Sequence, residues 1–263
     1  SRHVAFGGSQ GADDFPARLV PHFLLQTGRI PNQIPTGPWR APGDNTFAWV
    51  TNSFLDELAH AAGRDPVEFN LDLLGSHGVL PASRPRGGSY NVPRMRKVIE
   101  VAAEKSGWGA KLPPGEGMGL GYYFSHAGYV AEVAKVTVSK SGDLKVDRVV
   151  AAVDVGSQIV NLSGAESQIQ GSIIDGLGAA WYQEVNVDQG RVVEGNLAEY
   201  PMIRLPDAPR DIQIHYVKSP YPPTGLGEPC LPSIAPAVSN AIFAATGKRI
   251  RQLPFSGTDL SWA

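Results

Sequence analysis

The chain has 263 residues, of which 42% are hydrophobic, and a formal net charge of −2. This length and apolar content are enough to bury a large core, in one large domain or in two lobes. The small net charge gives no electrostatic reason to expect a nucleic acid partner. Cys230 is the only cysteine, so an internal disulfide is excluded, and an iron–sulfur cluster would need thiolates from another chain. No run approaches the roughly 20 apolar residues that span a bilayer.

The first part of the chain is predicted to be a loop-rich arm followed by a helix. Residues 1–44 are rich in Gly and Pro and contain few periodic runs. Residues 46–62 carry apolar side chains at helical spacing, with Asn45 as a plausible N-terminal cap and Gly63 as the stop. The arm is expected to need a neighbour to order it.

Two further helices are predicted before residue 110. Asp65 and Pro66 supply a cap and a first-turn proline for one of them. Gly, Pro, Ser and Arg dominate residues 75–90, which indicates a loop or lobe boundary. Another helix is expected at about 93–106. We therefore predict that residues 1–110 form an arm and a helical lobe.

The middle of the chain is predicted to contain a β-hairpin. Residues 129–138 are rich in strand-forming side chains, a turn follows at 141–143, and residues 144–150 continue with partial alternation. The glycine-rich stretch 117–121 lacks the spacing of a dinucleotide-binding fingerprint and is interpreted as a flexible entry to a strand.

A helix is predicted over residues 164–181. Gln168 and Gln170 fall near its start, where amides and free backbone N–H groups can meet a ligand's oxygens. Each glycine inside a helix costs about 1 kcal/mol relative to alanine, so embedded glycines indicate close approach to a ligand or to another element. The helix contains three of them: Gly171, Gly176 and Gly178.

Near the end of the chain, Glu228 stands between Gly227 and Pro229, before a small-residue helix that is predicted to stop at Gly247. A partly desolvated carboxylate on such a turn is suited to act as a general base, although a solvated turn glutamate has the same local pattern. Residues 111–263 are predicted to form an α+β lobe, with mixed sheets and packed helices.

The segment that carries Glu228 has the pattern G-E-P-x-x-P-x-x-A-P-A-x-x-N-A-I-F-A-A-T-G-K-R-I-R-x-L-P. It resembles the carboxy-terminal segment of the molybdenum hydroxylases, the xanthine dehydrogenase and aldehyde oxidase superfamily. The likeness is greatest to molybdopterin-binding subunits of the isoquinoline 1-oxidoreductase type and to bacterial membrane-associated aldehyde dehydrogenases. The resemblance implies that Glu228 is the catalytic base beside molybdenum, with Gly227 at the cofactor.

Two earlier stretches strengthen the resemblance. Residues 119–178 are similar to the family's strand pair, D-x-G turn and glutamine-glycine helix, which implies that Gln168, Gln170 and Gly171 contact the cofactor. The segment P-T-G-P-W-R-A-P-G-D-N resembles a loop that lines the metal site, which implies that Trp39 and Arg40 lie near molybdenum. The implied fold is the C-terminal part of a molybdopterin-binding domain.

The resemblance also implies cofactors and partners. The cofactor would be molybdopterin cytosine dinucleotide, whose molybdenum takes no ligand from protein side chains. The family's other glycine-rich cofactor loops have no convincing copy here, so a chain with the N-terminal half of the molybdenum domain is expected as a partner. A small [2Fe-2S] subunit and a cytochrome c are further expected partners.

The implied reaction is the oxidation of an N-heteroaromatic compound or an aldehyde, with water as the oxygen source. A bacterial protein, periplasmic or membrane-associated through its partners, is expected, and a cytoplasmic location stays open. One alternative is a non-catalytic scaffold that completes a partner's active site. Another is a serine hydrolase that uses Ser9, which lies in a G-x-S-x-G string without the required strand and helix around it. The six histidines show no paired ligand spacing and are assigned surface or core roles.

Overall fold

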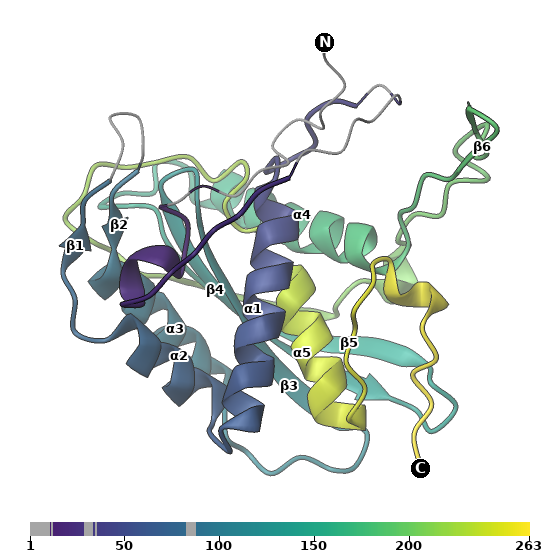
Figure 1. Ribbon diagram of the computed structural model, residues 1–263, viewed down its shortest axis with the longest axis horizontal. Coiled ribbons are helices and arrows are strands. Elements are labelled where there is room, and N and C mark those ends of the chain that lie inside the picture. The colour runs from purple at the N-terminus through teal and green to yellow at the C-terminus, as the bar shows by residue number, and fades with distance from the viewer. Residues whose placement is uncertain (1–10, 12, 29–33, 35, 83–87) are drawn as a thin grey trace.

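The computed structural model describes residues 11, 13–28, 34, 36–82 and 88–263 (Figure 1). At its centre is a four-stranded sheet in the order β3-β4-β5-β8. Strand β4 is antiparallel to both of its neighbours, β3 and β5, and β8 is parallel to β5. The strands are β3 (Glu116–Ser125), β4 (Gly128–Val138), β5 (Leu144–Asp154) and β8 (Asp211–Tyr216).

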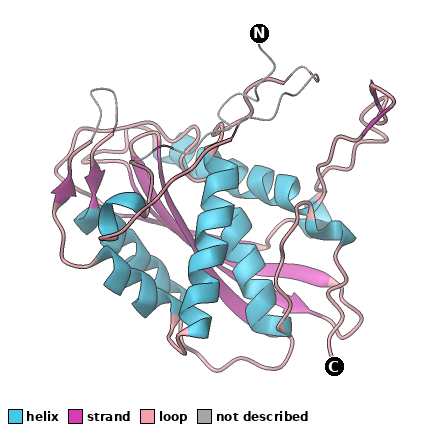
Figure 2. Ribbon diagram, viewed as in Figure 1, coloured by secondary structure: helices cyan, strands magenta, loops and turns pink. Residues whose placement is uncertain are grey.

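Helices cover both faces of this sheet (Figure 2). Helix α4 lies in the connection from β5 to β8, since parallel neighbours need a crossover. The α-helices are α1 (Asp44–Ala61), α2 (Pro66–Leu74), α3 (Val92–Ser106), α4 (Leu162–Trp181) and α5 (Ile234–Thr246). Two small strand pairs also occur: β1 (Val79–Leu80) with β2 (Tyr90–Asn91), and β6 (Val187–Asp188) with β7 (Arg191–Val192).

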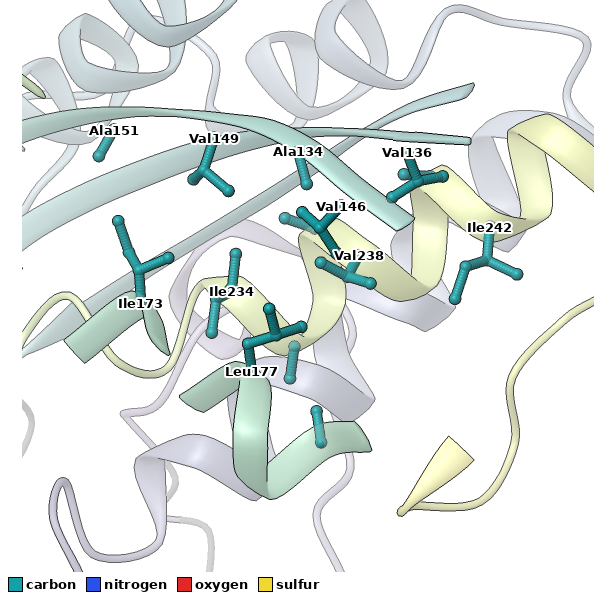
Figure 3. Packing of buried hydrophobic residues seen from close by; sticks show 14 of the residues in the cluster. Ala134, Val136, Val146, Val149, Ala151, Ile173, Leu177, Ile234, Val238 and Ile242 are labelled. Atoms are coloured by element: carbon teal, nitrogen blue, oxygen red, sulfur yellow. The ribbon is translucent and has the colours of Figure 1, made fainter. Parts of the chain in front are cut away.

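Two hydrophobic cores form because successive side chains of a strand point to opposite faces of the sheet. On β4, Val130 and Ala134 belong to the core shared with α4 and α5, whereas Ala131 and Val133 belong to the core shared with α2 and α3. Figure 3 shows the first core, where side chains of α4 and α5 meet those of the strands. The predicted α+β fold is confirmed.

Helix α5 lies directly on the backbone of β3, and glycine makes this possible. A methyl group at Gly117 would stand 2.3 Å from the carbonyl oxygen of Ala241, and one at Gly119 would stand 2.2 Å from the Ala241 nitrogen. At Gly121 the corresponding distance is 2.1 Å, to the carbonyl oxygen of Ser233. Real Cβ atoms do not approach other atoms so closely, so the glycines are required for this packing.

Several local predictions are confirmed. Asp65 caps α2 by accepting hydrogen bonds from the backbone N–H groups of Val67 and Glu68. Strands β4 and β5 form the predicted hairpin, and α5 ends at Gly247, whose φ of +74° is in the left-handed region.

Three details differ from prediction. Asn45 does not cap α1; the cap residue is Gly43, and the Asn45 side chain donates to the carbonyl oxygen of Arg40. The stretch 117–121 is the interior of β3 rather than a flexible entry, because α5 packs against its glycines. The expected boundary at 75–90 contains strands β1 and β2. The division into 1–110 and 111–263 stays a prediction.

The connection between α4 and β8 leaves the body of the molecule. Figure 1 shows its small β6–β7 hairpin projecting away from the sheet. Leu197 and Leu205 in this connection are among the most exposed apolar side chains described, at 73% and 89%. Among the helices of the described residues, none has the length and apolarity to cross a membrane.

Glu132 is an unusual member of the core. It lies on β4 between Val130 and Ala134, is fully buried, and neither carboxyl oxygen has a hydrogen-bond partner. Burial raises the pKa of Glu132 well above its ordinary value. The group therefore stays protonated in the fold at pH values where the unfolded chain has released the proton.

The substitution Gly119→Ala should strongly destabilise the fold, because the new methyl group overlaps the α5 backbone. Overpacking typically costs ~1–3 kcal/mol, and overlap with backbone falls at or beyond the upper end. Chemical denaturation of the purified protein measures this. Gly78→Ala is the matched control, since no atom lies within 4 Å of its added carbon. Equal stability of the two variants would contradict the close contact.

Replacing Glu132 by Gln should stabilise the protein increasingly as pH rises. The folded-state pKa is raised, so wild-type stability is fully present below the unfolded value of about 4.3 and falls as pH increases above it. Glutamine does not ionise. The melting temperature of Glu132→Gln relative to that of the wild type should therefore increase from about pH 5 to about pH 8. A pH-independent difference, or the same trend in the exposed control Glu184→Gln, would refute this.

Candidate functional site

Arg40 connects three segments that are far apart in the sequence. Its Nε donates to the carbonyl oxygen of Gly227 at 2.7 Å, which ties the arm to the turn before α5. Its Nη2 donates to Gln168 on α4, at 3.3 Å to the backbone oxygen and 3.1 Å to Oε1. Its Nη1 lies 3.4 Å from the Asp175 carboxylate. Three of the predicted site residues, Arg40, Gln168 and Gly227, are therefore in direct contact.

Glu228 occupies the predicted tight turn, closed by the Leu231 N–H donating to the Glu228 carbonyl oxygen at 3.1 Å. The backbone N–H of Ala41 donates to Glu228 Oε1 at 2.9 Å. Ala41 is fully buried with a φ of +54°, so its N–H is held in a conformation that alanine rarely adopts. The Glu228 side chain is 36% exposed, and the carboxylate is thus both oriented and accessible.

His126 is a member of the site that the sequence analysis missed. It lies in the turn between β3 and β4, and its Nε2 is 2.9 Å from Glu228 Oε2. Its Nδ1 is 2.7 Å from Ser125 Oγ, and this hydroxyl also donates to Asp44 Oδ2. Histidine spacing could not reveal it, because no second histidine takes part. The available signal was its place in a short turn between two strands.

Asp44 is the first residue of α1 and the most enclosed carboxyl group of this cluster. Burial raises the pKa of Asp44, and this outweighs the hydrogen bond from Ser125 and the attraction of His126. The imidazole of His126 therefore lies between two carboxyl groups, Glu228 at 2.9 Å and Asp44 at 3.8 Å. Such a cluster can hold and exchange protons near the candidate base.

Trp39 points to a neighbouring cavity and is not among the contacts of Glu228. It lines an apolar cavity of about 440 Å³ together with Trp49, Leu231 and Pro232. The Trp39 side chain is 42% exposed. Because Trp39 adjoins Arg40 and Leu231 follows the Glu228 turn, the cavity lies beside the site.

Gln170 and Gly171 lie on the open side of α4. Gln170 is exposed, and a methyl group added at Gly171 would meet nothing within 4 Å. Gly176 and Gly178 instead allow close packing against Leu231, Ile234 and Ile203. The helix begins at Leu162, so Gln168 lies in its second turn and has no free backbone N–H. The predicted ligand contact through a free backbone N–H is therefore not possible at Gln168, and only the side-chain amides of Gln168 and Gln170 remain as possible contacts.

The donor and acceptor groups suit a cofactor held by hydrogen bonds. The Arg40 guanidinium, the Gln168 amide and the Glu228 carboxylate lie where the arm, α4 and the turn before α5 meet, whereas Gln170, two residues from Gln168 along the helix, points to another side. A pterin with phosphate groups carries matching acceptors and donors, and Arg pairs well with phosphate oxygens. No cluster of three or more His, Cys, Asp or Glu side chains that could hold a metal ion was found within the described part of the chain.

The chain is similar to a family model and to several known proteins. Residues 90–209 match the model of a molybdopterin cofactor-binding domain. A membrane-bound aldehyde dehydrogenase of Gluconacetobacter polyoxogenes, whose name includes pyrroloquinoline quinone, is 33% identical over 81% of this chain and 28% of its own length. The beta subunit of isoquinoline 1-oxidoreductase from Brevundimonas diminuta is 32% identical over 82% and 26%. A nicotinate dehydrogenase subunit of Pseudomonas putida is 32% identical over 81% and 18%.

The fold is shared with solved structures as well. The aldehyde oxidoreductase of Desulfovibrio gigas superposes with a TM-score of 0.63 and 16% identity, over 83% of this chain and 40% of that one. This chain spans only about a quarter of the length of the first two relatives. Helix α4 with Gln168 falls inside the matched cofactor domain. By its cofactor domain, its relatives and its fold, the chain belongs to the molybdenum hydroxylase family, as part of a molybdopterin-binding subunit.

Proposed function

We propose that this chain is part of a molybdenum-dependent oxidoreductase of the hydroxylase type, in which Glu228 is the general base. One observation carries the proposal: the Glu228 carboxylate is accessible, yet one oxygen is held by the Ala41 N–H at 2.9 Å. A glutamate that merely lies in a solvent-exposed turn would not need a hydrogen bond from a buried N–H on a residue with positive φ. Arg40 supports the same turn through the carbonyl oxygen of Gly227.

The residues of this chain would orient the reactants and move a proton. When bound, the molybdenum cofactor supplies the electron-accepting centre, and water is the source of the oxygen atom. Glu228 takes up a proton on its carboxylate, for which the group must be ionised and within hydrogen-bond reach of the reacting oxygen. The Ala41 N–H holds one carboxylate oxygen in place.

We propose that Gln168, Gln170, Gly171, Gly227, Trp39 and Arg40 contact the cofactor. The amides on the open side of α4 and the guanidinium of Arg40 supply hydrogen bonds, and the missing side chain at Gly171 lets a ligand approach the helix. Molybdopterin cytosine dinucleotide is the proposed form. The match to a molybdopterin domain favours this cofactor over the pyrroloquinoline quinone in one relative's name.

The proposed substrate is an N-heteroaromatic compound or an aldehyde. The names of the relatives include isoquinoline, nicotinate and aldehyde as compounds acted on. The cavity lined by Trp39 and Trp49 has the apolar, aromatic walls that a flat or hydrophobic substrate would contact.

The proposed partners are a chain or segment with the rest of the molybdenum domain, a small [2Fe-2S] subunit and a cytochrome c. The modest share of each relative that this chain spans, and the naming of two relatives as subunits, support an assembly. A periplasmic or membrane-associated location through these partners is proposed from the membrane-bound relative. The serine hydrolase alternative depends on Ser9, which lies outside the described residues.

Replacing Glu228 by Gln should abolish most turnover while molybdenum stays bound. Gln retains an oxygen that can accept from the Ala41 N–H, but it is not basic, so the rate should fall by at least ~10²- to 10⁴-fold. Turnover and molybdenum content of the purified complex measure this, with the exposed Glu184→Gln as control. Near-normal turnover in a molybdenum-replete Glu228→Gln complex would leave the scaffold alternative as the better explanation.

Replacing Gln168 by Ala should lower molybdenum occupancy with little effect on folding. The change removes one or two hydrogen bonds of ~1 kcal/mol each to the cofactor, and it also releases Arg40 Nη2. The neighbouring Ser167→Ala, which alters an exposed hydroxyl on the same helix, should load normally. Metal analysis and circular dichroism of both variants make the comparison. Equal loading would assign Gln168 a purely structural role.

A further inference from the structure

The turn that carries His126 adopts a conformation its residues do not favour. Ser125 pairs with Gly128 across the hairpin, and the two residues between them, His126 and Ala127, have φ values of +49° and +62°. Two-residue hairpin turns of this kind are normally Asn-Gly or Asp-Gly, because glycine, Asn and Asp tolerate positive φ better than other residues do. The hairpin alone would thus be more stable with another residue at position 126.

Such strained residues gather at the candidate site. The described residues contain four non-glycine positions with positive φ, namely Ala41, His126, Ala127 and Gln189. Two of them, Ala41 and His126, contact the two oxygens of Glu228, and a third lies in the same turn. Strained backbone persists where surrounding contacts enforce it, and it concentrates at functional sites.

We propose that His126 is a positioning residue for Glu228, an inference that rests on the proposed role of Glu228 as the base. The Ala41 N–H holds Oε1, and the Nε2–H of His126 holds Oε2 at 2.9 Å. With both oxygens held, rotation of the carboxylate away from the reacting atoms is restricted.

The orientation of the imidazole is set on its other side. Its Nδ1 contacts Ser125 Oγ at 2.7 Å, and Ser125 is hydrogen-bonded in turn to Asp44 on α1. The titratable groups that face this cluster are Glu228 from the turn before α5, Asp44 from α1, and Asp14 and Tyr123 near Asp44. Because the Ser125 hydroxyl donates its one proton to Asp44, the contact at Nδ1 is an Nδ1–H that donates to Ser125 Oγ. The Nε2–H that holds Glu228 is then the second proton of a charged imidazole that lies between two carboxyl groups.

Two substitutions at position 126 separate positioning from folding. Asn suits the turn better than His does, so the melting temperature of His126→Asn should hold or rise. The Asn side chain is, however, too short to reach Glu228. Turnover of the molybdenum-loaded complex should therefore fall ~10- to 100-fold, as for loss of a hydrogen bond to a charged group.

His126→Gln should recover part of the turnover, since its amide N–H can donate from nearly the same place as Nε2. The exposed His77, in the loop after α2, provides the matched control His77→Asn, which should be unchanged. A readout independent of activity is the ring nitrogen resonance of His126 Nε2 in isotope-labelled complex, which should change in Glu228→Gln because the carboxylate acceptor at 2.9 Å is lost.

Unchanged turnover in His126→Asn would overturn the proposal. A loss that follows only from lower melting temperature or lower molybdenum content would overturn it as well, by making His126 structural. Failure of the underlying function looks different, because Glu228→Gln would then retain its turnover. If Glu228→Gln is inactive while His126→Asn is fully active, only the positioning role fails.

Discussion

The place of Glu228 depends on how closely α5 lies on β3. Alternate glycines of β3, at 117, 119 and 121, remove every side chain from the strand face under the helix. Helix α5 has small residues such as Ala237 and Ala241 on this side, so the backbone of the helix contacts the backbone of the strand. Close-packed backbone leaves no room for adjustment. The turn before α5, and the carboxylate on it, are therefore fixed to the sheet.

The candidate site is made where separate elements end. The arm supplies Ala41 and Arg40, the β3–β4 turn supplies His126, α4 supplies Gln168, and Glu228 precedes α5. Each contributor is attached to a helix or strand of the packed core, which holds side chains more precisely than a free loop does. Because most links are hydrogen bonds to charged groups, they are stronger than neutral ones and also directional. Precision at the base thus comes from several elements at once.

Much of this arrangement could be predicted from sequence where the signal is local. The Asp65 cap, the β4–β5 hairpin and the glycine stop of α5 follow from short-range rules. The motif resemblance predicted that Arg40, Gln168 and Gly227 belong to one site, and Arg40 contacts the other two. Strand β3 could not be predicted in this way, because alternating glycines weaken a strand on their own. They are explained only by α5, a helix more than a hundred residues later in the chain.

His126 escaped prediction for the same reason. Its partners Glu228 and Asp44 are distant in the sequence. Its turn was not predicted either, because residues 117–121 of β3 had been interpreted as a flexible entry to a strand. A histidine in the centre of a two-residue hairpin turn contradicts turn preferences. A local rule that is broken in an otherwise regular hairpin is a sign that a distant contact takes precedence.

The short β3–β4 turn also limits how this part of the chain can change in length. Its two residues set the pairing of Ser125 with Gly128, and through it the pairing of every residue along both strands. An insertion or deletion of one residue would exchange the two faces of β3. Leu120 and Tyr122 would then face α5 where only glycine fits. Homologous chains can therefore vary the residues of this turn, but a one-residue change in its length would have to be compensated elsewhere in the hairpin.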